Sequence, residues 1–526
     1  MANIVLSSLV LIALLHLCDG YKILLVFPVA NKSHNILGAG YVKHLLDAGH
    51  EVTYATPYPT NKTTDKYHEV DLSKYIDFFD KAIGKMINLK VILNKETNPH
   101  VLGMLTQFVD MMWSMLKNEN LVNFLGDPTQ EFDAVIVEWL ITDAFAGIAS
   151  LFNCPLIWSS SVEPHWLVLQ LVHEPSNPSF NPNVFSTISR KLPPYTFFER
   201  VTNLFSMAAF KAVKYFYLLP KETAMYEKFF TPLFAKRGRQ LPSYEEVLYN
   251  GTFLLTNSHT SLSQPISVPP NVKEIGGYHI DPNTKPLPAN LQKIMDEAKH
   301  GVIYFSMGSN AKSKDWPESL KKEFMEVFGG LKQTVLWKFE EQLPNLPKNV
   351  HILEWAPQQS ILARPNMRLF ITHGGLLSTT ETVYFGVPTI VIPYGVDQHV
   401  NALRAVNKGY AKMVDLSYEM AGEMKAAIEE MLTSTKYSEK VKELSKLVHD
   451  RPVSPGKELV HWVEHVVRTR GAPHLRSPAL LLPWYQKMYF DLLALVVVAL
   501  YVIKVVLQLL FRKGSTKVPI TKKKTN

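Results

Sequence analysis

The amino-acid sequence predicts two doubly wound α/β domains followed by one transmembrane helix. Its length of 526 residues exceeds the roughly 250–300 residues that a single hydrophobic core usually serves. In both halves, short apolar runs alternate with helix-length segments, the pattern of a parallel sheet covered by helices on both faces. An unbroken apolar stretch lies near the C-terminus, at residues 489–511.

The first 20 residues predict a secretory signal peptide. Their apolar core, from Ile4 to Leu17, is too short to span a bilayer comfortably, and Gly20 offers a small residue at a cleavage point. No positive charge precedes this core, so a buried N-terminal strand is the alternative. Cys18 would leave with the peptide, and Cys154 would then be a lone cysteine that fills the core.

The first predicted domain covers residues 21–260. Its expected strands and helices alternate in the order strand 22–29, helix 35–48, strand 51–56, strand 134–137, helix 143–152 and strand 156–158. Residues 196–236 are longer, aromatic and helical, and we expect them to wall a pocket for an apolar ligand.

A proline-rich stretch without periodicity, residues 261–288, is interpreted as a linker to a second domain, residues 289–470. The alternation restarts there, with expected strands at 302–305, 334–337, 350–353, 369–371 and 389–392. Two such domains facing each other place a cleft at the carboxyl ends of their strands, where doubly wound folds bind ligands. Residues 471–488 are expected to form a juxtamembrane segment.

The apolar stretch 489–511 matches the ~20 residues that cross ~30 Å of hydrocarbon. Residues 512–526 carry six lysines and arginines and no acid, so most of the formal net charge of +8 sits in this tail and does not indicate nucleic-acid binding. The positive-inside rule places the tail in the cytoplasm and the two domains in the lumen, as a type I protein. Lys523 and Lys524 resemble the dilysine retrieval signal of the endoplasmic reticulum; a plain basic stop-transfer tail is the alternative.

Three sequons fit the N-glycosylation pattern. Asn61 and Asn250 are predicted to be glycosylated, which fits a lumenal domain. Asn31 is expected to lie buried in a turn and to stay unmodified.

The stretch THGGLLSTTETVYFGVP, Thr372–Pro388, follows an apolar strand and leads into a helix that begins near Ser378. Its two glycines let the chain turn sharply and let a ligand approach the backbone. The free N–H groups of a helix N-terminus favour an anion such as phosphate, and His373 can donate to phosphate oxygens. Glu381 would repel phosphate but suits ribose hydroxyls, so the stretch predicts a nucleotide diphosphate site.

Three other strand ends predict matching parts of a nucleotide-sugar site. Phe305–Asn310 (FSMGSN) offers small hydroxylated residues for phosphate. Glu354–Gln359 (EWAPQQ) offers an indole for stacking on a base and an amide for its edge. Tyr394–Gln398 (YGVDQ) offers a carboxylate and an amide that suit paired sugar hydroxyls.

These blocks, in this order and spacing, resemble the signature of the UDP-glycosyltransferase family, which includes the UDP-glucuronosyltransferases and their insect relatives. The resemblance extends over essentially the whole chain, from signal peptide to lysine tail. It implies a GT-B fold of two Rossmann-like domains facing a cleft, with the acceptor in the N-terminal domain and the UDP-sugar in the C-terminal one. The UDP-sugar is a co-substrate, and neither a cofactor nor a metal is implied.

The resemblance also implies roles for individual residues. Trp355 would stack on uracil, Gln358 would reach the base or ribose, and Glu381 would bind ribose hydroxyls. The remaining UDP-sugar contacts would come from Ser306, His373 and Gly375 at the diphosphate, Asp397 and Gln398 at the sugar, Lys338 near the nucleotide, and Ser378.

The family's general base is a histidine after the first strand, which corresponds to His34 here. A hydroxyl is a poor nucleophile, and an imidazole with a pKa near roughly 6.5 can take its proton as the new bond forms. A carboxylate should orient this imidazole. The family places an aspartate after the strand that ends at Val137, and we favour Asp143 because its acid type matches; Glu138, at the strand end, is the alternative.

The sequence therefore predicts a membrane-anchored, lumenal glycosyltransferase of the endoplasmic reticulum with a role in detoxification. It would transfer glucose from UDP-glucose to a small lipophilic acceptor with inversion, which gives a β-glycoside. A UDP-glucuronosyltransferase and a catalytically silent lipophile-binding homologue are the alternatives. A homo-oligomer is left open.

Overall fold

A computed structural model describes residues 20–86, 92–94, 101–172, 176–181, 191–248, 251–309, 313–395 and 397–513. The chain forms two compact units, residues 1–476 and 477–526, which are described separately. The predicted signal peptide apart from Gly20, the predicted glycosylation site Asn250, and the tail with Lys523 and Lys524 lie outside the described residues.

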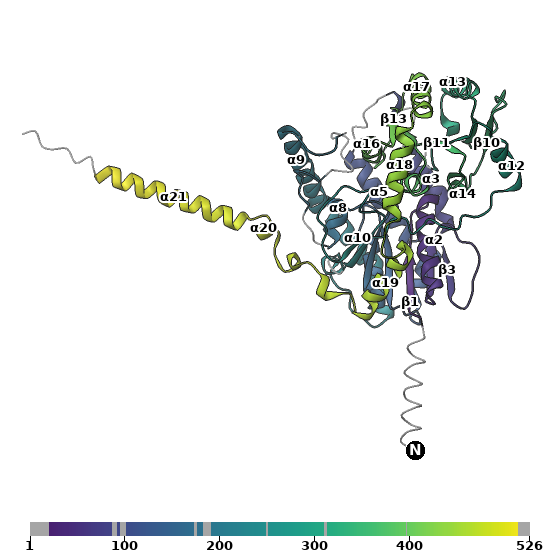
Figure 1. The fold of residues 1–526 in the computed structure, drawn as a ribbon. Helices are drawn as coiled ribbons and strands as arrows, with labels where there is room; N and C mark the ends of the chain where they lie inside the picture. The colour runs from purple at the N-terminus through teal and green to yellow at the C-terminus, as the bar shows by residue number, and fades with distance from the viewer. Residues whose placement is uncertain are drawn as a thin grey trace, which may run out of the picture. The chain divides into compact units, whose positions relative to one another are not determined.

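The first sheet has seven parallel strands in the order β3-β2-β1-β4-β5-β6-β7 (Figure 1). The strands are β1 (Lys22–Val26), β2 (Glu51–Thr56), β3 (Tyr67–Asp71), β4 (Ala134–Trp139), β5 (Leu156–Ser160), β6 (Gly251–Thr256) and β7 (Val272–Glu274). The central strands β1 and β4 are buried almost throughout, which explains why they read as continuous apolar runs. Strand β7 lies inside the stretch 261–288 that was interpreted as a linker, and its three residues are too few to show a periodicity.

Helices cover both faces of this sheet (Figure 1). They are α2 (Lys32–Asp47), α3 (Ile76–Met86), α5 (Val101–Leu116), α6 (Glu119–Gly126), α7 (Gly147–Phe152), α8 (Trp166–Leu169), α9 (Phe197–Val213), α10 (Leu219–Lys236) and α11 (Tyr244–Leu248), with 3₁₀ turns η1 (Ser73–Tyr75), η2 (Ala144–Ala146) and η3 (Gln170–Val172).

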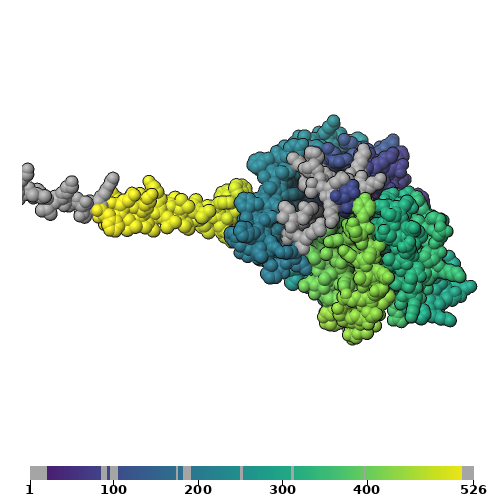
Figure 2. Space-filling view, turned by 90° about the horizontal axis from the view of Figure 1, so that it is seen from above, coloured from purple at the N-terminus to yellow at the C-terminus, as the bar shows by residue number. Residues whose placement is uncertain are grey.

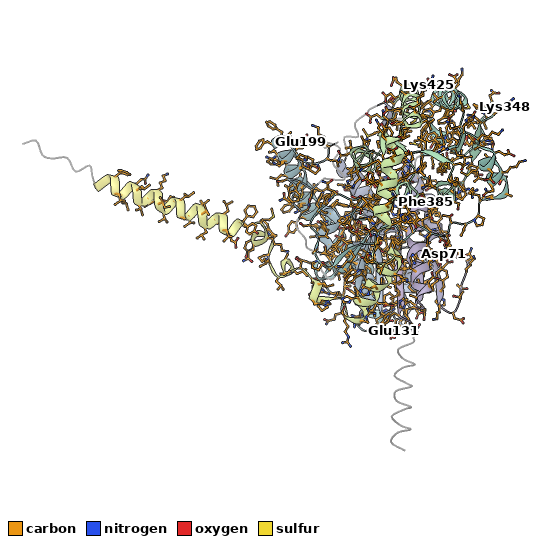
Figure 3. The ribbon with its side chains drawn as sticks, in the orientation of Figure 1. Asp71, Glu131, Glu199, Lys348, Phe385 and Lys425 are labelled. Carbon is orange, nitrogen blue, oxygen red and sulfur yellow. The ribbon has the colours of Figure 1, made fainter. Side chains whose placement is uncertain are left out.

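The aromatic stretch expected at 196–236 forms α9 and α10, joined by a π-helical turn, η4 (Lys214–Leu218). Helix α9 begins with a capping box, in which Thr196 Oγ1 accepts from the backbone N–H of Glu199 and the Glu199 carboxylate accepts from the backbone N–H of Thr196. Figure 3 labels Glu199 on this helix. The α10 side chains Phe230 and Phe234 are buried in the first core, whereas Phe198 on α9 is exposed.

The second sheet has six parallel strands in the order β10-β9-β8-β11-β12-β13. The strands are β8 (Val302–Ser306), β9 (Thr334–Lys338), β10 (Val350–Leu353), β11 (Met367–Thr372), β12 (Thr389–Val391) and β13 (Ala411–Met413). The helices and turns are α12 (Ala289–Glu297), η5 (Ser313–Asp315), α13 (Glu318–Gly329), α14 (Gln358–Leu362), α15 (Leu376–Phe385), α16 (Gln398–Asn407), α17 (Met420–Thr433) and α18 (Lys436–His449). The prediction of two parallel α/β sheets is confirmed.

The two halves of the first unit lie against each other, as the purple-to-blue and green surfaces of Figure 2 show. Two segments exchange sides. Helix α19 (Pro455–Arg468) follows the second sheet but packs Leu459 and Val463 into the core of the first. Leu93, between α3 and α5, is buried in the core of the second sheet. These exchanges hold the halves, hereafter the acceptor lobe (first sheet) and the donor lobe (second sheet), as one compact unit.

The last element of the first unit is the 3₁₀ turn η6 (Pro473–Leu475). The second unit contains the 3₁₀ turn η7 (Pro478–Leu481), followed by α20 (Trp484–Lys487) and α21 (Phe490–Lys513). Residues Phe490–Phe511 are long and apolar enough to cross a membrane, with a mean hydropathy of 2.6. This span agrees with the predicted stretch 489–511.

Candidate active site

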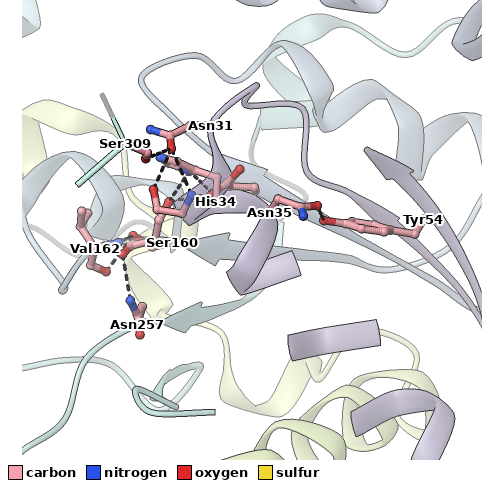
Figure 4. Close-up of polar contacts among 11 residues, drawn as sticks. Asn31, His34, Asn35, Tyr54, Ser160, Val162, Asn257 and Ser309 are labelled. Atoms are coloured by element: carbon pink, nitrogen blue, oxygen red, sulfur yellow. Dashed lines mark hydrogen bonds and ion pairs between the residues drawn. The ribbon is translucent and has the colours of Figure 1, made fainter. Parts of the chain in front are cut away.

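His34 lies in the first turn of α2, just beyond the carboxyl end of β1 (Figure 4). The helix begins because Asn31 adopts an extended backbone and its side-chain oxygen accepts from the backbone N–H of Ser33 at 3.0 Å. The hydroxyl of Ser33 donates to the same oxygen at 3.1 Å. Asn31 is buried, as expected from the sequence, and this cap fixes the start of the helix and with it the position of the imidazole.

Glu138 is the penultimate residue of β4, which lies next to β1 in the sheet. Because Val26 is in register with Val137, the residues that follow both strands meet at one edge. The Nδ1 atom of His34 lies 2.5 Å from Oε1 of Glu138. The hydroxyl of Ser161, after β5, donates to the same Glu138 oxygen at 2.8 Å and lies 3.3 Å from His34 Nδ1.

The protonation of His34 is set by competing effects. Burial alone would lower the pKa of this imidazole, but the charge of Glu138 and its hydrogen bond raise it, and the charge of Asp397 in the donor lobe adds to the rise. The net result is a pKa above the ordinary value of 6.5. The imidazole is therefore biased toward accepting a proton.

The structure does not bring Asp143 to His34, although the sequence favoured it as the partner. Its carboxylate accepts from Trp139 Nε1 at 2.7 Å and pairs with Lys214 Nζ at 2.8 Å. Asp143 precedes the turn η2 and belongs to a separate buried cluster in which burial and this carboxylate raise the pKa of Glu222 to about 7. Glu138 is the carboxylate against His34 because it is still on the strand, whereas a tight turn at Ile141 redirects the chain before Asp143.

At the donor-lobe edge, three strand ends gather around His373. Gly308, which follows β8, and Gly374 have φ angles of +78° and +84°, a region that favours glycine. A Cβ atom on Gly308 would lie 2.5 Å from the His373 ring, and one on Gly375 would lie 2.6 Å from its Nε2. The glycines therefore make room for this imidazole between the two loops. The Ser306 hydroxyl accepts from the Gly308 N–H at 3.3 Å and braces the first loop.

Lys338, at the end of β9, lies on the same side. Its Nζ donates to the Gly308 carbonyl at 2.9 Å and to Glu340 Oε1 at 2.6 Å. Burial and this nearby cation lower the pKa of His373 to about 4. His373 is therefore neutral at physiological pH, with a ring stacked on Tyr394 at a centroid distance of 5.8 Å.

A network of amides surrounds Glu381 on α15. Gln358 Nε2 donates to Glu381 Oε2 at 2.6 Å and to Ser378 Oγ at 3.1 Å. Gln359, which the sequence analysis passed over, donates to Glu381 Oε1 at 2.9 Å. His279 lies 3.4 Å from the same oxygen. The predicted residues Gln358, Ser378 and Glu381 thus form one connected cluster.

Trp355 is the most open of the predicted site residues, with 53% of its surface exposed. Lys32 of the acceptor lobe lies over its ring, with Nζ 4.1 Å from the ring centroid. A half-exposed indole at the mouth of a polar cluster is suited to stacking on a flat ring.

The sugar-site candidates Asp397 and Gln398 stand at the N-terminus of α16. Gln398 Oε1 accepts from the backbone N–H groups of Tyr394 and Gly395 at 2.9 and 3.2 Å, which shapes the turn. Asn401 donates to Asp397 Oδ2 at 2.8 Å and to the Gly374 carbonyl at 2.9 Å. Asn401 was missed in the sequence, although its place four residues after Asp397 puts both on one helix face.

The loops at the carboxyl edges of the two sheets contact each other directly. The hydroxyl of Ser309, in the donor-lobe loop after β8, donates to the side chain of Asn31 at 3.0 Å (Figure 4). The cap of the His34 helix is therefore in contact with the loop that also holds Gly308. The lobe that carries the His34–Glu138 pair and the lobe that carries His373 therefore touch at this edge.

A profile of UDP-glucoronosyl and UDP-glucosyl transferases matches residues 22–525. The chain belongs to this family of glycosyltransferases. UDP-glucosyltransferase 2 of Dactylopius coccus is 33% identical over 91% of this chain and 90% of its own length. UDP-glycosyltransferase UGT5 of the same species is 31% identical over 98% and 99%. UDP-glucuronosyltransferase 1A7 of Rattus norvegicus is 30% identical over 91% and 90%.

Solved glycosyltransferase structures share the fold of this glycosyltransferase. The spinosyn forosaminyltransferase SpnP aligns with a TM-score of 0.54 at 15% identity, over 85% of this chain and 99% of that one. The calicheamicin glycosyltransferase CalG4 gives 0.53 at 16%, over 86% and 100%. These likenesses establish the GT-B arrangement of the two lobes.

Proposed function

We propose that this glycosyltransferase moves glucose from UDP-glucose to the hydroxyl of a small lipophilic acceptor with inversion at the anomeric carbon. Family membership supports the UDP-sugar, and the similarity to a protein named UDP-glucosyltransferase 2 supports glucose. The observation that carries the catalytic part is the 2.5 Å contact between His34 Nδ1 and Glu138 Oε1.

In this proposal Glu138 holds the Nδ1–H of His34, so that Nε2 presents its lone pair to the acceptor. The acceptor oxygen attacks the anomeric carbon, its proton passes to Nε2, and the bond from that carbon to the UDP oxygen breaks with its electron pair on UDP. Ser161 supports Glu138 through its 2.8 Å hydrogen bond. The raised pKa of His34 increases the driving force for this proton transfer.

The donor lobe binds the UDP-sugar in the same proposal. Uracil stacks on Trp355, and the Gln358–Glu381 cluster holds the ribose. The diphosphate lies at the loops of Ser306 and Gly375, where the neutral His373 ring can donate one N–H. Supporting residues are Ser378, Lys338, and, for the glucose hydroxyls, Asp397 and Gln398. Backbone N–H groups at the start of α15 stabilise the charge that develops on UDP.

The acceptor class is inferred from the apolar side chains near the carboxyl ends of β4 and β5. Trp139, the last residue of β4, packs in one core with Trp166, whose indole meets the ring of Phe210 on α9 at a centroid distance of 5.1 Å. Such surroundings support a flat or greasy acceptor over a bulk polar glycan. Lumenal placement in the endoplasmic reticulum, with Asn61 glycosylated, is part of this proposal; Asn61 is exposed.

The experiment is a donor-by-acceptor screen of the full-length protein in microsomes, read by mass spectrometry. UDP-glucose and UDP-glucuronate are each supplied with a panel of phenols and aliphatic alcohols. We expect β-glucosides as products, with one UDP released for each glucoside formed. Faster turnover with UDP-glucuronate would overturn the donor assignment, and UDP binding without any product would overturn the enzymatic one.

A further inference from the structure

A buried ion pair joins the two lobes beside the site. Arg404, on α16 of the donor lobe, donates through Nη1 to the carboxylate of Glu163, in the acceptor-lobe loop after β5. Both residues are 8% exposed. A buried pair of this kind is weak evidence for stability, because the cost of desolvating two charges offsets much of their attraction. Its location therefore matters more than its strength.

On the acceptor-lobe side, Glu163 belongs to a braced loop that touches the base. Two residues earlier, the Ser161 hydroxyl contacts both Glu138 and His34 Nδ1. The Ser161 carbonyl accepts from Asn257 Nδ2 at 3.2 Å, and Ser160 Oγ donates to the Val162 carbonyl at 3.0 Å (Figure 4). Only Val162 separates Glu163 from Ser161, so a displacement of Glu163 is transmitted to Ser161 through one residue whose carbonyl is held by Ser160.

On the donor-lobe side, Arg404 shares a helix face with the proposed glucose binders. Asp397, Asn401 and Arg404 are spaced by four and three residues, so they follow one another along α16. Asn401 ties this face to the Gly374 carbonyl in the loop of His373. Holding Arg404 therefore fixes the rotation of α16 and the position of the Asp397 carboxylate.

We propose that the Glu163–Arg404 pair is a positioning element that sets the distance between the His34 base and the glucose end of the donor. This inference rests on the proposed function, since it takes His34 as the base and Asp397 as a glucose binder. Neither Glu163 nor Arg404 needs to touch a substrate. The pair acts through Ser161 on one side and through α16 on the other, and it leaves the uracil end of the site, at Trp355, untouched.

The test uses Glu163→Gln, Arg404→Gln and Arg404→Lys in the full-length protein. Rates are expressed per UDP-binding site, so that misfolded protein does not count. Because misplacement of reacting groups by about 1 Å costs on the order of 10²-fold in rate, we expect kcat to fall by about 10- to 100-fold in the two Gln variants. The Kd for UDP should stay within about twofold, and Arg404→Lys should recover part of the rate by keeping the charge.

Arg451→Met is the matched control, because Arg451 also joins the lobes, with Nη1 3.1 Å from the Gly276 carbonyl, and no proposed site residue is among its hydrogen-bond partners in the part of the chain that the structure describes. It should leave kcat per UDP site unchanged. An unchanged kcat in Glu163→Gln, or an equal fall in Arg451→Met, would overturn the positioning role. His34→Ala separates this inference from the proposed function: if that variant keeps full turnover, the base assignment fails whatever the Glu163 variants show.

Discussion

His34 and His373 are two imidazoles at the carboxyl edges of two similar parallel sheets, yet their surroundings drive them in opposite directions. His34 faces the carboxylate of Glu138, and its pKa is raised despite burial. His373 faces the ammonium group of Lys338, and burial together with that charge lowers its pKa to about 4. The two rings lie in different lobes, one in each.

The difference shows that the neighbours, and not the residue type, assign each histidine its chemistry. An acid beside a buried imidazole makes a proton acceptor, which suits the acceptor lobe. A cation beside a buried imidazole keeps it neutral, as a hydrogen-bond donor in a loop of glycines that suits an anionic ligand. Each prediction below tests one side of this division.

The largest expected effect is on the proton acceptor. His34→Ala should lower kcat by roughly 10²–10⁴-fold, because the acceptor hydroxyl loses its general base. The Kd for UDP should be nearly unchanged, since the proposed nucleotide site is in the other lobe. Steady-state kinetics and calorimetric titration with UDP measure the two effects. Comparable losses in rate and in UDP affinity would contradict the assignment of the base to the acceptor lobe and of UDP binding to the donor lobe.

The next largest effect distinguishes two buried carboxylates, Glu138 on β4 and Asp143 just beyond the turn that follows it. Glu138→Gln should lower kcat by roughly 10²-fold, because the amide no longer orients or stabilises the protonated His34. Asp143→Asn is the matched control: it removes the partner of Lys214 and should reduce thermal stability, with a much smaller loss of rate per folded molecule. If Asp143→Asn costs more in kcat, the partner of the base has been misassigned.

The pH dependence of the rate also tests the pairing of His34 with Glu138. His34 must be neutral to act as a base, so kcat should fall as the pH drops through its raised pKa, above 6.5. In Glu138→Gln the two effects of Glu138 that raise this pKa disappear while burial still lowers it, so the acid limb should move to lower pH. The comparison is a pH–rate profile of both proteins between pH 5 and 9. An acid limb at the same pH in both would contradict the pairing.

A smaller effect is expected at the uracil end. Trp355→Ala should weaken UDP binding by about 1–3 kcal/mol, the range found for base–aromatic stacking. In saturating UDP-sugar, kcat should change little, because the proposed role of the indole is to bind uracil and not to transfer a proton. Trp484→Ala, at an exposed indole of the second unit, controls for general loss of a surface aromatic. A fall in kcat with normal UDP affinity would place Trp355 in catalysis instead.

The sequence predicted both sheets and the membrane-length helix, and it singled out Gln358, Ser378 and Glu381, which the structure brings into one cluster, because strand ends and glycines leave a local signal. It did not predict which acid meets His34. Glu138 and Asp143 are five residues apart, and the choice depends on the left-handed turn at Ile141 (φ +63°), an unusual conformation for a β-branched residue. Contacts across the lobes, such as Lys32 over Trp355 and Glu163 with Arg404, leave no local signal either, since they depend on how two separate sheets pack.

The smallest expected effect is on the pH dependence of stability, to which His373 and His34 contribute with opposite signs. The folded pKa of His373 lies below the ordinary 6.5, so the unfolded chain binds its proton first and stability falls as the pH drops from 6.5 toward 4. The folded pKa of His34 lies above 6.5, so its contribution is complete below 6.5 and is lost as the pH rises through the folded value. His373→Gln should therefore reduce the amount by which the Tm at pH 8 exceeds the Tm at pH 5.5, whereas His34→Gln should increase it. Differential scanning fluorimetry of the purified protein measures both, with the exposed His68→Gln as control. Shifts of the same sign in both variants would show that the neighbours do not set the protonation of these two rings.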